Sequence, residues 1–210
     1  MGIPVASILI LIFILWLQYE IRKSGKVSKN SLDHFWLKEN DSNLVRRKDI
    51  SQLEYLSVSL DKLPMEDHAD DTINSYRDTI KKYAERKMIN LSGKTNTELK
   101  FEFGAANLNL LSSYDNNYTA FVSMLQKWAV RLKEQGYTSD AQAVLEFSIY
   151  SCLTDVTNAY RMLNEIYLNQ NNSEKTDALI EIIYKTKIKD KDKLIEELKS
   201  MSLRNSYQYL

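Results

Sequence analysis

The stretch LQKWAVRLKEQGYTSDAQAVLEFSI, residues 125–149, decides how this chain folds. Its first half continues a run of apolar side chains that recur every three or four residues, the period of one helix face. A second, shorter pattern of the same kind follows Gly136. Because glycine adopts the positive φ that ends many helices, the stretch predicts two helices joined by a tight turn. The apolar run consists of Tyr114, Tyr118, Phe121, Leu125, Trp128 and Leu132.

The same pattern occurs again 35 residues later, in YRMLNEIYLNQNNSEKTDALIEIIY, residues 160–184. The offset aligns Trp128 with Leu163 and Gly136 with Asn171. Each copy reads as a long helix, a Gly or Asn turn, and a shorter amphipathic helix. The chain therefore repeats a helix–turn–helix unit with a period close to 35 residues.

This repeat resembles the tetratricopeptide repeat family over residues 118–187. That family places an aromatic residue or leucine, a small residue, the turn glycine and a second small residue where this chain has Trp128, Ala129, Gly136 and Ala141. The second copy departs from the pattern, because Asn164 replaces the first small residue. The resemblance implies an all-α fold, a short α-solenoid of antiparallel helix pairs.

Solenoids usually need at least three units to bury a continuous core, so residues 68–112 are a candidate third, divergent unit. The last predicted helix carries Leu194, Leu198 and Met201 on one side and charged residues on the other. We expect it to act as a capping helix for the solenoid.

The family binds partners in a groove lined mainly by the first helix of each pair. Carried onto this sequence, the resemblance implies a set of polar residues that would contact a protein or peptide partner. Exposed polar residues facing only water would follow the same pattern, so both interpretations stay open. The predicted partner-binding residues are Gln126, Lys133, Asn158, Arg161 and Glu165.

The first 19 residues, MGIPVASILILIFILWLQY, carry no charged side chain. At about 1.5 Å per residue this helix would just cross a bilayer core, with Trp16 and Tyr19 at its far interface. A cleaved secretory signal would have a basic start and a small-residue cleavage site, and neither is present. We therefore predict a retained transmembrane anchor over residues 1–20, in preference to a cleaved signal or a buried core helix.

Basic residues follow the anchor on one side only. Residues 20–48 hold eight Lys and Arg against four acids, a net charge of +4, so the rest of the chain carries −4. The positive-inside rule then predicts a single-pass protein of the cell membrane, with its N-terminus outside and its C-terminal domain cytoplasmic. A slightly acidic body is a poor match to a nucleic-acid-binding protein.

We interpret residues 21–66 as a basic, turn-rich juxtamembrane connector and residues 67–210 as the helical-repeat domain. Within the connector, Leu56, Val58 and Leu60 alternate with serines, which predicts a short extended strap on the helical body or an edge for a partner strand. The connector segment beginning FWLKEND, at Phe35, also resembles that of membrane-anchored proteins of low-GC Gram-positive bacteria.

A helix predicted from Thr97 contains Gly104, which would let another helix approach closely. The polar stretch that follows it, residues 107–118, has two interpretations. Its Asn and Asp side chains either close a tight turn between helices or line the groove and hold an extended peptide backbone.

No catalytic, metal or cofactor motif stands out. His68 lies among acids but matches no ligand spacing, and an acidic helix start explains this segment better. The single cysteine, Cys152, excludes an intrachain disulfide and has no histidine near it in sequence, which favours a packed residue in a helix–helix turn.

The sequence thus predicts a non-enzymatic, membrane-tethered scaffold that binds a protein or peptide partner at the cytoplasmic face, with no cofactor and no metal. The alternative is an extracytoplasmic envelope-assembly or cell-wall-associated factor with the same helical body outside. An enzyme of unfamiliar type is a third hypothesis, which would require a pocket with convergent titratable groups.

Overall fold

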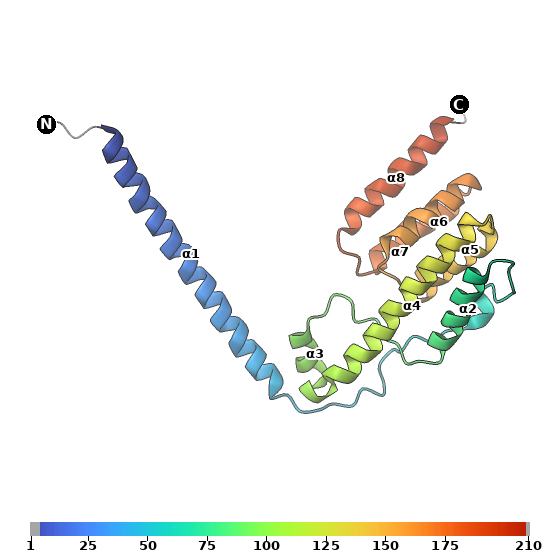
Figure 1. The fold of residues 1–210 in the computed structure, drawn as a ribbon, viewed down its shortest axis with the longest axis horizontal. Helices are drawn as coiled ribbons and strands as arrows, with labels where there is room; N and C mark the ends of the chain where they lie inside the picture. The colour runs from blue at the N-terminus through green and yellow to red at the C-terminus, as the bar shows by residue number, and fades with distance from the viewer. Residues whose placement is uncertain (1–4, 209–210) are drawn as a thin grey trace. The chain divides into compact units, whose positions relative to one another are not determined.

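The computed structural model describes the backbone of residues 5–208 and the side chains of residues 9–21 and 32–204. Over these residues the protein is all-α, as predicted, and contains no β-strand (Figure 1). The chain divides into two compact units. One combines the residues up to Ile50 with Thr95–Leu108, and the other combines Ser51–Lys94 with Asn109–Leu210.

The first unit contains α1 (Val5–Asn43), a single helix of 39 residues. The turn-rich structure expected from residue 21 does not interrupt it, because no proline falls within the helix and extending an existing helix costs little. The first four residues of the predicted anchor lie outside the described residues. In the part of the chain that the structure describes, no helix has the length and apolar content that a membrane span needs.

The helix α3 (Asn96–Phe103) also belongs to the first unit, and Thr95 and Glu98 form a capping box at its start. Gly104 ends this helix with a φ of +89°, so the expectation that it lies inside a longer helix is wrong. A Cβ at Gly104 would overlap the backbone carbonyl of Arg46, which leaves room only for glycine. The short 3₁₀ helix η2 (Ala105–Asn107) follows.

The side chain of Asn107 forms hydrogen bonds that link two segments of the first unit. Its side chain is fully buried, and its Nδ2 donates to the carbonyl oxygens of Lys48 at 2.7 Å and Phe103 at 2.8 Å. Its Oδ1 accepts from Arg47 Nε at 3.0 Å. One amide therefore joins the segment after α1 to the end of α3.

The second unit is a succession of packed helices. It holds α2 (Asp71–Ala84), most of α4 (Leu108–Glu134), α5 (Thr138–Glu146), the π-helix η3 (Phe147–Ser151), α6 (Thr157–Asn169), α7 (Ser173–Lys185) and α8 (Lys191–Gln208), with the 3₁₀ helix η1 (Leu60–Lys62) before them. The first helix pair is α4 with α5, and the second is α6 with α7 (Figure 1).

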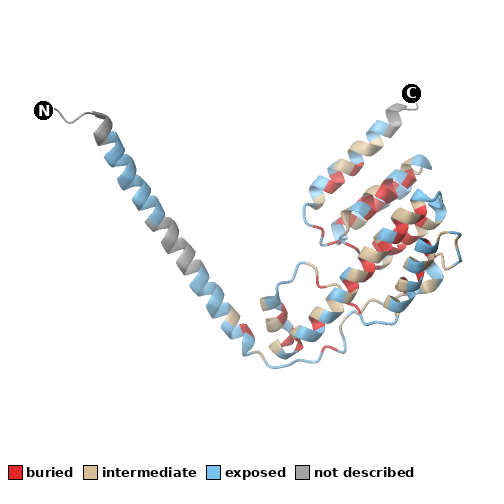
Figure 2. Ribbon diagram, in the orientation of Figure 1, coloured by how far each residue is buried: buried red, intermediate tan, exposed pale blue. Residues whose placement is uncertain are grey.

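Burial follows the 35-residue offset seen in the sequence. Trp128 in α4, Leu163 in α6 and Leu198 in α8 are all 0% exposed, so a buried position recurs in these three helices at an offset of 35 residues. Gly136 and Asn171, which end α4 and α6, both adopt positive φ, at +82° and +53°. Figure 2 shows buried residues concentrated on the packed helices of this unit, whereas α1 is exposed along almost all of its described length.

Two other expectations concern residues 51–112. The candidate third unit over residues 68–112 includes α2, which belongs to the second compact unit, and α3, which belongs to the first. The segment with alternating Leu56, Val58 and Leu60 forms no strand, and these three side chains pack against the hydrophobic core of the second unit. The backbone N–H of Leu56 donates to the carbonyl of Met88 at 2.9 Å.

Candidate interaction surface

The helices α4, α6 and α8 run in the same direction, with cross-helix contacts between residues separated by 32 to 37 positions. Gln126 in α4 contacts Met162 in α6, and Arg161 in α6 contacts Glu197 in α8. The residues that the sequence predicts to bind a partner all lie on two of these helices, α4 and α6.

Two of the predicted partner-binding residues converge on one methionine. Gln126 Nε2 lies 3.1 Å and Asn158 Nδ2 lies 3.5 Å from the Met162 sulfur, a weak acceptor. The Gln126 Oε1 atom is buried and has no hydrogen-bond partner among the described residues. A buried amide oxygen without a partner is uncommon in folded proteins, because leaving it unpaired costs free energy.

The other three predicted residues lie in ion pairs between helices. Lys133 Nζ donates to Glu165 Oε2 at 2.6 Å, which joins α4 to α6. Arg161 donates through Nε and Nη2 to the two oxygens of Glu197, at 2.8 and 3.0 Å, which joins α6 to α8. Hydrogen bonds from Arg161 lower the pKa of Glu197 below its ordinary value. These charged groups therefore already have partners within the chain.

An open groove lies on the other side of α4, between this helix and α2. Its volume is about 480 Å³. Of the five predicted partner-binding residues, only Gln126 lines this groove. Lys127 is exposed and has no ion-pair partner among the described residues. The groove is lined by Thr72, Tyr76, Gln126, Lys127, Val130, Arg131 and Glu134.

The end of this groove is held by Asp70, the N-cap of α2. Its Oδ1 accepts from the backbone N–H groups of Thr72 and Ile73, at 2.8 and 3.2 Å. Its Oδ2 accepts from Arg131 Nε at 2.9 Å, and this hydrogen bonding from Arg131, with a smaller contribution from the two N–H groups, lowers the pKa of Asp70. The acidic helix start predicted for residues 66–71 therefore also positions an arginine of α4.

His68 lies beside the same helix start. Its Nδ1 is 3.2 Å from the Glu66 carbonyl oxygen and its Nε2 is 2.9 Å from Asp140 Oδ2 in α5, and its ring packs edge-on against Tyr137. Both ring nitrogens thus have partners. No cluster of three or more metal-binding side chains occurs among the described residues.

Cys152 is 4% exposed in the turn between η3 and α6, where the sequence placed it. Burial raises the pKa of its thiol to about 12. A thiol that is both buried and protonated at neutral pH is a poor nucleophile.

The polar stretch of residues 107–118 forms the first turns of α4, so it is not a tight interhelical turn. Its side chains hold an extended backbone that belongs to the chain itself. Asp115 Oδ1 accepts from the N–H of Leu91 at 2.9 Å, and Asn117 Nδ2 donates to the carbonyl of Lys87 at 3.2 Å. The chemistry expected of a peptide-binding groove is thus used internally.

Sequence reasoning missed a second polar cluster, around Glu146 at the end of α5. Glu146 Oε1 accepts from Gln142 at 2.8 Å, from Tyr167 OH at 2.9 Å and from Lys175 at 3.0 Å. Burial opposes ionisation, but these hydrogen bonds outweigh it and lower the pKa of Glu146. The spacing of Gln142 and Glu146 was the available signal, since the other two partners come from α6 and α7.

The packed pairs of antiparallel helices define a helical protein whose architecture is compatible with a helical-repeat fold. Comparisons with known protein families, with curated proteins and with solved structures find no match to this chain.

Proposed function

We propose that this chain is a non-enzymatic protein-interaction scaffold with tetratricopeptide-like repeats, which holds a peptide segment of a partner in the groove between α2 and α4. The observation that carries the proposal is this groove of about 480 Å³, which opens beside the repeated helices. A groove between helices accepts a partner segment by combining apolar contacts with a few fixed polar groups.

The side chains of the groove support a peptide ligand. Tyr76 offers an aromatic surface with a polar tip, and Val130 adds apolar contact. Lys127 supplies a positive charge that the described residues do not neutralise, which favours an acidic group on the partner.

A membrane tether is the second part of the proposal, with the helical body on the cytoplasmic side. Nine consecutive side chains of α1, from Leu9 to Leu17, are apolar and 41% to 65% exposed. An apolar surface of this extent is typical of contact with lipid or with another protein. The one-sided basic flank after the apolar stretch supports the cytoplasmic orientation.

Affinity capture of the full chain in mild detergent tests the groove. Lys127→Glu combined with Tyr76→Ala should lose a partner that the unchanged protein retains. Lys185→Glu is the matched control, because Lys185 is an exposed lysine of α7 outside the groove. A partner captured equally by all three proteins would contradict the proposed groove.

Protease treatment of intact cells tests the orientation. The proposal expects the C-terminal domain to resist digestion until the membrane is broken. Digestion in intact cells would instead favour the extracytoplasmic alternative.

A further inference from the structure

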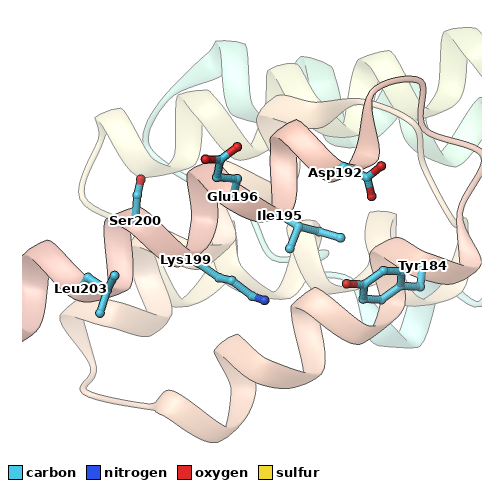
Figure 3. Close-up of a pocket in the computed structure, with 7 residues that line it drawn as sticks. All are labelled: Tyr184, Asp192, Ile195, Glu196, Lys199, Ser200 and Leu203. Atoms are coloured by element: carbon cyan, nitrogen blue, oxygen red, sulfur yellow. The ribbon is translucent and has the colours of Figure 1, made fainter.

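The outward face of α8 carries a stripe of four residues with spacings of 4, 3 and 4, namely Asp192, Glu196, Lys199 and Leu203. This spacing places the four side chains on one helix face. They line a groove of about 510 Å³ between α8 and α7. Figure 3 shows Tyr184 of α7 opposite Ile195 and Lys199 of α8 across this groove.

The groove between α7 and α8 contains exposed apolar side chains. Leu203 is 62% exposed and Tyr184 is 56% exposed, although the inner face of α8 is closed by buried Leu194 and Leu198. The outer side of α8 thus carries apolar surface that none of the described residues covers.

The charges on this stripe have an order. The two acids, Asp192 and Glu196, come first along the helix, and Lys199 follows them. When a second α8 lies antiparallel across the stripe, with the two-fold axis between residues 196 and 199, each Glu196 faces the Lys199 of the other copy. A parallel copy would instead place like charges opposite each other.

We propose that α8 forms an antiparallel, two-fold interface with α8 of a second copy of this chain. Leu203 of each copy lies opposite Asp192 of the other and beside its Tyr184, and two Glu196–Lys199 pairs flank the axis. A two-fold interface must be complementary to itself, and the order of charges on this stripe meets that requirement. This is why a second copy fits the groove better than an unrelated helix.

One helix face and one groove form a small interface. Interfaces below about 1,200 Å² of total buried area are characteristic of weak, transient association. Exposed ion pairs contribute roughly 0.2–1 kcal/mol each, so they select the orientation more than they supply affinity. We therefore expect a reversible monomer–dimer equilibrium.

Sedimentation equilibrium of the full chain in mild detergent, over a range of concentrations, tests the interface. The unchanged protein should dimerise reversibly. Glu196→Lys alone and Lys199→Glu alone should each weaken the dimer by about tenfold, because each replaces two attractive pairs by two repulsive ones. Lys189→Glu is the control, because Lys189 is exposed and lies outside the groove.

Mixing the two single variants makes the test specific. A Glu196→Lys chain carries a positive charge at both positions 196 and 199, and a Lys199→Glu chain carries a negative charge at both. The antiparallel arrangement therefore predicts that the mixture forms heterodimers at least as tight as the unchanged dimer. The double variant Glu196→Lys/Lys199→Glu should regain self-association.

Three outcomes would overturn the proposal. They are an unchanged protein that stays monomeric at all concentrations, single variants that dimerise as the unchanged protein does, and a mixture that gains nothing over its components. Leu203→Asp provides an independent check, because it should abolish dimerisation while circular dichroism confirms the native helix content.

Discussion

Two glycines show how much the surroundings of one residue matter. Gly104 and Gly136 have nearly the same φ, +89° and +82°. A Cβ at Gly136 would meet no atom within 4 Å, whereas at Gly104 it would overlap the backbone of Arg46. Both φ values are ones that residues with a Cβ rarely adopt, and Gly104 adds a steric clash.

Gly136→Ala should therefore lower the free energy of unfolding by about 1 kcal/mol, the usual cost of a left-handed conformation for a residue with a Cβ. Gly104→Ala should open the contact between α3 and the segment after α1. Thermal denaturation measures the first effect, and proteolysis within residues 44–50 measures the second. Equal protease sensitivity of both variants would contradict the predicted clash.

Cys152 should be almost unreactive in the folded protein. Its thiol has a pKa of about 12 and is 4% exposed, so its thiolate fraction at pH 8 is roughly a thousandfold below that of a free cysteine. Labelling with iodoacetamide should be slow in buffer and fast in denaturant. Rapid labelling of the native chain would show that the turn before α6 opens readily.

At the scale of a single element, Arg161 and Glu197 join α6 to α8. Arg161→Glu replaces a two-point ion pair by repulsion between two acids, so it should loosen α8. Hydrogen exchange should rise in α8 and stay unchanged in α4. Any loss of partner binding in this variant must therefore be compared with Lys127→Glu, which changes no helix contact.

A charged residue placed in the apolar stretch of α1 tests the proposed membrane tether. Ile12→Arg places a charge in the middle of its apolar stretch, and such a residue costs about 2.5–3.5 kcal/mol at the centre of a membrane helix. The variant should move from the membrane fraction to the soluble fraction after carbonate washing. Ser42→Ala, at the far end of α1, should leave the distribution unchanged.

The periodic features of these elements were predictable from the sequence. The 35-residue offset identified Trp128 and Leu163 as equivalent, and both are fully buried. The pairing partners of polar residues were not predictable, because Lys133 and Arg161 meet acids about 32 and 36 residues away across helix packing. The extent of α1 was missed since turn-prone residues do not stop a helix that is already formed.

At the scale of the whole molecule, the repeated helices should respond to mutation according to position. Stability in repeat arrays is approximately a sum of unit stabilities and nearest-neighbour terms. Leu163→Ala, in the middle, should lower the stability of the second unit by about 2–5 kcal/mol. Leu198→Ala should have a local effect, with faster hydrogen exchange confined to α7 and α8.

The same hydrogen-exchange profile for Leu163→Ala and Leu198→Ala would contradict a response that depends on position. It would indicate that the second unit unfolds as one cooperative block. The comparison is fair because both side chains are leucines with 0% exposure. The same experiment tests whether α8 behaves as a third first helix, as its register suggests.

The length of α1 determines how far its residues would lie from the charges of a membrane surface. With Tyr19 at a membrane surface and the helix along the membrane normal, Lys38 would lie about 28 Å from that surface. Counterions at physiological salt screen charges over about 8 Å. At Lys38, and at Asn43 about 36 Å beyond Tyr19, the field of anionic headgroups in such a membrane would then be almost fully screened.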